Sequence, residues 1–250
     1  MALQEEFEKQ GNVLFKYRSY FPLLLFPPAI VTIYYTFKYH PYYYQNGHLE
    51  FLMISSIIIG LIGLLIRIYT VGHTPKNTSG RNTHDQVADS LNTSGIYSIV
   101  RHPLYVGNFL MWLAIAMLTM NLWFVVAFVL SYWLYYERIM YAEEQFLRRK
   151  FGTTYTSWAD TKPAFIPSIS QFQSPKESFS WKKVLKKEKN GVFALFLIFW
   201  LFYLYVGYLN THEFTFTWHW TAIGAMISGI FYFVFKIIKS NTNWLDESSR

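Results

Sequence analysis

Long apolar stretches separated by short polar ones make up most of this chain. Apolar runs of the length that spans a bilayer recur along it, and we identify about six. Such a run predicts a membrane helix, because a helix satisfies the N–H and C=O groups of its own backbone. We therefore predict an all-α fold, a polytopic transmembrane helix bundle with about six membrane helices. The predicted helices cover residues 20–37, 51–71, 104–119, 122–141, 192–209 and 218–238.

Local features modify several of these predicted helices. Pro27 and Pro28 fall inside the first, which we therefore expect to be kinked or partly interfacial. The third is short, and its join to the fourth at Met120-Asn121 leaves room only for a tight helical hairpin. Arg67 lies near the end of the second, and we favour a side chain that snorkels to the headgroups over a functional one.

Polar segments divide the chain into four parts. Residues 1–71 hold the N-terminal transmembrane helices, after a polar lead that is either an interfacial helix or irregular. Residues 72–167 form a core of a polar loop, two helices and a second polar segment. Residues 168–190 are a basic connector, which we interpret as a solvated or headgroup-bound helix. Residues 191–250 hold the C-terminal transmembrane helices.

The distribution of Lys and Arg predicts the orientation of the bundle. Apart from Arg67 and Arg138 inside predicted helices, Lys38 is the only basic residue assigned to one side of the membrane. All others fall on the opposite side. The positive-inside rule then places both termini and the polar core in the cytoplasm. We expect a multi-pass integral protein of a bacterial inner membrane.

Composition narrows the classes of function. Hydrophobic residues make up 52% of the chain and charged residues only 15%, with a net charge of +7. Basic loops facing anionic lipid headgroups explain this charge better than a nucleic-acid partner does. Without cysteine, the chain has neither a disulfide framework nor a thiolate metal site, and we predict no metal. No glycine-rich dinucleotide-binding loop is present.

The segment Asn92–Asn108, NTSGIYSIVRHPLYVGN, departs from the membrane pattern. Its polar and special residues suit a folded pocket at the membrane surface better than a lipid-facing helix. Pro103 suits the first turn of a new helix, since its missing N–H would be unpaired there anyway. Arg101 and His102 would then lie at the N-terminus of that helix, where backbone N–H groups and the helix dipole favour an anion.

Acidic residues gather at the end of the fourth predicted helix. Glu137, Tyr141 and Glu144 share one helical face, and Glu143 lies beside it. Carboxylates at the end of a membrane helix are costly unless they are paired or hydrated. They indicate either a structural network with nearby arginines or a site for a cationic ligand. We favour the structural role for Glu137 and the ligand site for Glu144.

A second helical face carries aromatic and amide side chains. Tyr105, Asn108, Phe109 and Trp112 share it in the third predicted helix. Tyr and Trp rings there could pack on a ligand or provide a cation–π surface, although plain aromatic packing is an equal alternative for Trp112.

These segments resemble the isoprenylcysteine carboxyl methyltransferase and phospholipid methyltransferase superfamily. The similarity combines SGIY and RHPLYVGN with the downstream AEEQFLRRKFGTTYTSWADTKPAFIP, and covers Gly95 to Pro167. Trp158 departs from the pattern, which often has Tyr there. The resemblance implies an integral membrane enzyme that uses S-adenosylmethionine in a cytoplasm-facing cofactor pocket. We expect cofactor contacts from Gly95, Tyr97, His102, Pro103, Tyr105, Gly107, Asn108 and Glu143.

Two further residues are assigned to catalysis. Arg101 would bind an anionic acceptor beside the methyl donor, and Glu144 would orient Arg101 or the ammonium group of the cofactor. Glu143 remains an alternative to Glu144 as the functional carboxylate. The acceptor should be amphiphilic, because the pocket opens among membrane helices.

The polar loop at residues 72–94 is where we look for acceptor specificity, and it includes a short helix predicted from Thr83 to Leu91. Lys76 and Arg81 suit a phosphosugar head, so we favour a phosphate-bearing lipid such as lipid A. The alternatives are carboxyl methylation of an isoprenylcysteine-like substrate and N-methylation of phosphatidylethanolamine. A membrane reductase or a lipid-binding protein is the alternative outside the methyltransferases.

Overall fold

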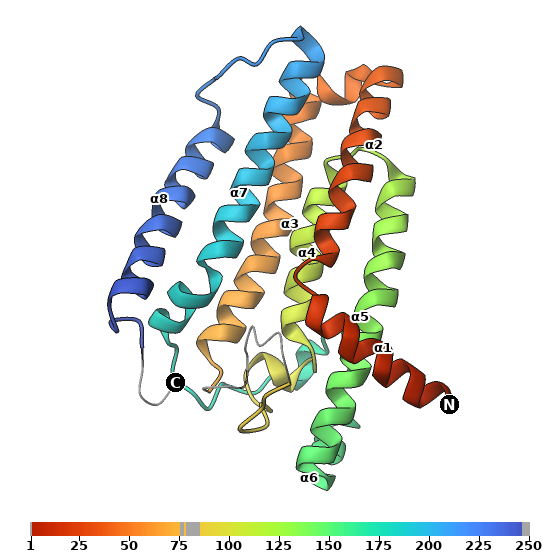
Figure 1. The fold of residues 1–250 in the computed structure, drawn as a ribbon, viewed down its shortest axis with the longest axis vertical. Helices are drawn as coiled ribbons and strands as arrows, with labels where there is room; N and C mark the ends of the chain where they lie inside the picture. Colours follow the sequence, from red (N-terminus) through yellow and green to blue (C-terminus); the bar gives the residue numbers. More distant parts are fainter. Residues whose placement is uncertain (1, 76–77, 79–85, 247–250) are drawn as a thin grey trace.

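The computed structural model describes residues 2–75, 78 and 86–246. In this part of the chain all regular structure is helical, apart from one isolated bridge between Gly95 and Gln173. The long helices form an elongated bundle (Figure 1). The α-helices are α1 (Leu3–Tyr17), α2 (Phe26–Tyr39), α3 (Asn46–Gly72), α4 (Pro103–Met117), α5 (Leu122–Phe151), α6 (Thr153–Ala159), α7 (Trp181–Thr211) and α8 (Trp220–Asn241). Short 3-10 turns are η1 (Phe21–Leu25), η2 (Pro41–Tyr44), η3 (Ile96–Ser98) and η4 (Ile169–Gln171).

Three of the described helices, α3, α7 and α8, are long and apolar enough to cross a membrane. A fourth span exists if α1 and the helical segment Pro22–Tyr39, bent by 80°, count as one. The apolar helix α4 is shorter, and the acidic residues of α5 begin at Glu137. Each of the six predicted apolar segments is helical over most of its length. Length and composition support an integral membrane protein with three spans or four, while the number six stays a prediction.

The two ends of the bundle hold different connections between the helices. Figure 1 shows both chain termini and α6 at the lower end, whereas the α2–α3, α4–α5 and α7–α8 connections lie at the upper end. This arrangement agrees with the prediction that both termini and the polar core lie on one side. Which compartment that side faces stays a prediction.

Helices α3 and α4 approach each other closely at two glycines. A Cβ atom on Gly63 would lie 2.5 Å from the carbonyl oxygen of Gly107, and one on Gly107 would lie 2.7 Å from that of Gly63. Neither contact leaves room for a methyl group. The two glycines therefore permit the close packing of α3 against α4.

The N-terminal end of α4 is held by a segment far along the chain. The backbone N–H groups of Arg101 and His102 donate to the carbonyls of Pro163 (2.9 Å) and Ala164 (3.2 Å). The N–H of Ser168 donates to Ile99 (2.9 Å). These bonds place the end of the second polar segment directly against the Arg-His-Pro sequence, and α4 begins at Pro103 as predicted.

Two predictions about polar segments are wrong. Residues 86–91 of the predicted helix Thr83–Leu91 are irregular, and its first three residues lie outside the described part of the chain. The predicted connector is not a separate solvated helix, because α7 runs unbroken from Trp181 to Thr211. The predicted boundary at residue 190 lies inside this helix. Three charged side chains of the connector are buried by packing of α7 against the bundle: Lys183, Glu188 and Lys189.

Candidate active site

A cavity of about 500 Å3 opens near the lower end of the bundle. Its walls come from the α1–η1 junction, α3, the loop before η3, and helices α4 to α7. Seven of the ten predicted site residues line it: Tyr97, Arg101, His102, Pro103, Tyr105, Asn108 and Glu143. Glu144 does not line the cavity but contacts His102, which does. Gly95 and Gly107 do not line it either, and each packs against another segment of the chain.

The structure gives each of the two glycines a local role. Gly95 has φ of +61°, a conformation that favours glycine, and its N–H donates to the carbonyl of Gln173 at 3.0 Å. Gly107 faces α3, and a Cβ there would lie 2.6 Å from Cγ of Arg67. Both residues hold the walls of the site in place. Direct contact of either with a cofactor stays a prediction.

His102 lies between two carboxylates from α5. Its Nε2 is 2.8 Å from Oε1 of Glu144, and its Nδ1 is 3.6 Å from Oε2 of Glu143. The hydroxyl of Tyr105 donates to Glu143 (2.8 Å). Because each nitrogen of the buried imidazole faces a carboxylate, the ring is held in one orientation at the mouth of α4.

The pKa values of this cluster shift in opposite directions. Burial disfavours the charged form of His102, but hydrogen bonds and attraction from Glu143 and Glu144 outweigh it and raise the pKa of His102 above 6.5. Burial also disfavours ionised Glu144, yet its hydrogen bond to His102 and the nearby positive charges lower its pKa below 4.5. Both shifts favour the charged forms of His102 and Glu144.

These shifts predict how stability depends on pH. The contribution of His102 is fully present below pH 6.5 and is lost as pH rises through the raised pKa of the folded protein. The contribution of Glu144 is present above pH 4.5 and is lost as pH falls through its lowered pKa. We expect His102→Gln to lower the thermal midpoint in detergent most between about pH 4.5 and 6.5, and less at higher pH. The exposed His48, replaced by Gln, is the control; equal pH profiles for both variants would contradict the charged cluster.

Arg101 shares the Glu144 carboxylate with His102. Its Nε lies 3.3 Å from Oε1 of Glu144, an ion pair without the geometry of a hydrogen bond. The guanidinium also lines the cavity. Glu144 therefore holds Arg101 and His102 side by side from behind, consistent with its predicted orienting role.

The predicted aromatic face of α4 is divided between two environments. Tyr105, Asn108 and Trp112 line the cavity, whereas Phe109 packs against Phe128 and Phe165 with centroid distances of 6.0 and 5.7 Å. Phe109 is therefore a packing residue. The structural interpretation of Glu137 is confirmed, because its carboxylate pairs with neighbouring Arg138 at 3.1 Å.

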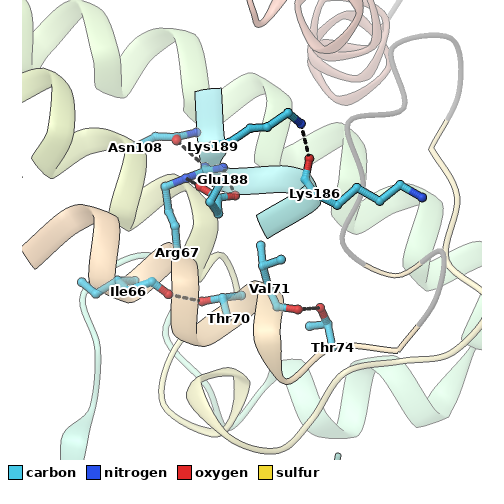
Figure 2. Close-up of polar contacts among 9 residues, drawn as sticks. All are labelled: Ile66, Arg67, Thr70, Val71, Thr74, Asn108, Lys186, Glu188 and Lys189. Carbon is cyan, nitrogen blue, oxygen red and sulfur yellow. Dashed lines mark hydrogen bonds and ion pairs between the residues drawn. The ribbon is translucent and has the colours of Figure 1, made fainter. Parts of the chain in front are cut away.

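A second buried charge cluster, which the sequence did not predict, is centred on Arg67 and lines the same cavity (Figure 2). Nε and Nη2 of Arg67 donate to the two carboxylate oxygens of Glu188 at 2.8 and 2.7 Å. Nη1 of Arg67 donates to Oδ1 of Asn108 at 2.5 Å. The snorkelling interpretation of Arg67 is therefore wrong, because its side chain is only 13% exposed and fully engaged. The signal was present, since a charged residue within a membrane helix usually has a partner inside the bundle.

The loop before η3 also borders the cavity. Gln86, Val87, Ala88 and Leu91 line it, as do Arg18 from the α1–η1 junction and Lys187 from α7. This position is where a loop that selects the acceptor would lie. Lys76 and Arg81, which suggested a phosphosugar head, lie outside the described residues.

The comparisons with known proteins agree with this site. Residues 53–154 match the model of the phospholipid methyltransferase family, a range that includes α4, all of α5 and the carboxylate–histidine cluster. The resemblance to the superfamily is confirmed. Helices α7 and α8, including Glu188, lie outside the matched range. The search of solved structures gives no match.

Curated relatives fall into two groups by name. The nickel-cobalt-cadmium resistance protein NccN of Alcaligenes xylosoxydans is 31% identical over 122 residues, which cover 48% of this chain and 54% of that protein. The protein-S-isoprenylcysteine O-methyltransferase of Schizosaccharomyces pombe is 38% identical over 77 residues, or 31% of this chain and 33% of the relative. Protein-S-isoprenylcysteine O-methyltransferase B of Arabidopsis thaliana is 32% identical over 121 residues, with 47% and 58% coverage. The chain thus spans about half the length of most curated relatives it matches, and a third of the yeast one.

Proposed function

We propose that this chain is a membrane methyltransferase that uses S-adenosylmethionine to methylate a lipidated acceptor. The observation that carries the proposal is the cluster of Arg101, His102, Glu143 and Glu144 at the wall of a cavity among apolar helices. It lies within the segment that matches the phospholipid methyltransferase family.

The residues present fit this cofactor. S-adenosylmethionine supplies an activated methyl group when bound, so the protein mainly needs to orient the reactants and exclude water. Glu143 offers a carboxylate to an ammonium or a ribose hydroxyl, and Tyr97, Tyr105 and Trp112 supply aromatic surface. The apolar helices around the cavity keep water away from the site.

We propose a carboxylate as the methyl acceptor, as in an isoprenylcysteine-like substrate. Six of the relatives are named isoprenylcysteine O-methyltransferases or probable ones. The guanidinium of Arg101 presents a planar fork that matches the two oxygens of a carboxylate. Nothing among the described residues favours lipid A, and an amine acceptor presents no anionic oxygen at its reacting atom for Arg101 to bind.

The excess of basic residues in the predicted cytoplasmic loops supports a site at the cytoplasmic face, where the cofactor is made. Two of the relatives are bacterial, which agrees with a bacterial inner membrane as the location.

Cofactor binding tests this proposal directly. Protein purified in detergent should bind S-adenosylhomocysteine by calorimetry, and its thermal midpoint should rise with ligand concentration. A labelled methyl group from S-adenosylmethionine should pass to a farnesylcysteine derivative. No binding at millimolar ligand by folded protein would refute the methyltransferase and leave a reductase or a lipid-binding protein.

A further inference from the structure

We propose that the ion pair of Arg67 and Glu188 positions the side chain of Asn108, whose amide NH2 group donates to a neutral acceptor group of a ligand in the cavity. All three residues line the cavity, and none belongs to the cluster around His102. Glu188 lies in α7, outside the segment that matches the phospholipid methyltransferase family. The inference rests on the proposed function and adds two positioning residues to its site.

The contact with Arg67 decides which way the amide group of Asn108 points. A guanidinium can only donate, so Nη1 of Arg67 requires the amide oxygen, Oδ1, as its acceptor. The amide nitrogen is therefore the end of the group that is left for another partner. No described residue accepts a hydrogen bond from this nitrogen, although the side chain lines the cavity. An acceptor atom of a ligand in the cavity can satisfy it.

Glu188 and Gly107 keep the guanidinium of Arg67 in this position. Both carboxylate oxygens of Glu188 accept from Arg67, and the two side chains are 2% and 13% exposed. The stem of Arg67 crosses α4 at Gly107, where a Cβ atom would lie 2.6 Å from Cγ of Arg67. Helices α3, α4 and α7 thus fix the guanidinium (Figure 2), and the amide of Asn108 is oriented before a ligand arrives. Such preorganisation lowers the entropic cost of binding.

The charges of this wall favour a neutral acceptor group. The negative charge of Glu188 offsets the positive charge of Arg67, so Asn108 offers its donors beside a pair without net charge. Trp112 follows Asn108 by about one helical turn and also lines the cavity, where its ring can pack against a planar group. Because a charged ligand group would find no opposite charge left to pair with here, a ring nitrogen, a hydroxyl or an amide carbonyl fits best.

Two reactants of the proposed methyl transfer carry neutral acceptor groups. The adenosine part of S-adenosylmethionine has ring nitrogens and ribose hydroxyls, and an acylated isoprenylcysteine has an amide carbonyl. Calorimetry with two pairs of probes distinguishes these sources. The first pair is S-adenosylhomocysteine and methylthioadenosine, which share the adenosine but not the amino-acid end. The second pair is N-acetylfarnesylcysteine and farnesylthiopropionic acid, which lacks the amide.

Asn108→Leu should weaken the binding of one reactant about tenfold. An equal loss for both adenosine probes assigns the contact to the adenosine, and a loss for N-acetylfarnesylcysteine but not for its amide-free partner assigns it to the amide. A loss confined to S-adenosylhomocysteine, an equal loss for both farnesyl probes, or no loss at all would overturn the neutral acceptor. Asn210→Leu is the matched control and should change no affinity, since Asn210 lies near the other end of α7 and donates to Val206 at 3.0 Å.

The positioning role is tested in the double variant Arg67→Leu, Glu188→Leu, which leaves neither charge of the pair buried alone. We expect it, when folded, to bind the responding probe about tenfold more weakly than the wild type, because the amide of Asn108 is free to turn. Adding Asn108→Leu to the double variant should weaken binding little further, since both changes remove the same interaction. Wild-type affinity of the double variant, or losses that add, would show that the pair does not position Asn108. Failure of the folded wild-type protein to bind any probe would instead refute the methyltransferase, and this inference with it.

Discussion

Replacing Glu188 by Leu should lower the free energy of unfolding by about 3–5 kcal/mol. The substitution leaves the guanidinium of Arg67 with only Asn108 as a partner, because both oxygens of Glu188 accept from it. Glu188 is 2% exposed, so water cannot replace the lost carboxylate without rearrangement of the cavity wall. The measurement is unfolding in detergent, followed by denaturant or temperature.

The double variant Arg67→Leu, Glu188→Leu distinguishes the contribution of the intact ion pair to stability from the cost of leaving one buried charge unpaired. Removing both charges also removes the cost of burying them, so the double variant should recover most of the lost stability. The pair of exposed Arg149 with partly exposed Glu8, 2.6 Å apart, is the control, and Glu8→Leu should cost about 0–1 kcal/mol. If Glu188→Leu costs no more than this control, the buried pair is not a determinant of stability.

Arg101→Lys should lower kcat/KM for methyl transfer about tenfold to a hundredfold. Lysine keeps the positive charge but loses the planar fork that can bind both oxygens of a carboxylate. It also loses the contact of Nε with Glu144, which holds the guanidinium beside His102. The measurement is transfer of a labelled methyl group to a farnesylcysteine free acid by protein that is shown to be folded.

The affinity for S-adenosylhomocysteine, measured on the same variant, shows whether Arg101 contacts the acceptor or the cofactor. An unchanged affinity places the lost interaction on the acceptor, and a parallel loss places it on the carboxylate of the cofactor. Lys150→Arg is a matched control, since this exposed residue lies near the end of α5 and does not line the cavity. Turnover of Arg101→Lys close to that of the wild type would show that the fork does not bind the reacting ligand.

Local chemistry in the sequence determined several features that the structure confirms. Apolar runs predicted α2 to α5, α7 and α8, because a segment that crosses lipid must satisfy its own backbone. Pro103 predicted the first residue of α4 for an equally local reason, since proline suits the first helical turn. The positions of Glu143 and Glu144 in the sequence placed both carboxylates toward the C-terminal end of α5. The resemblance to the methyltransferase superfamily includes the same two residues.

The tertiary structure alone decided which of these residues meet. Arg67 and Glu188 are 121 positions apart, and neither helical periodicity nor composition indicates which face of α7 turns toward α3. Gly107 was expected at the cofactor, but the packing of α3 against α4 gives it a contact with Arg67. Sequence patterns report one element at a time, whereas pairing and burial depend on several elements together.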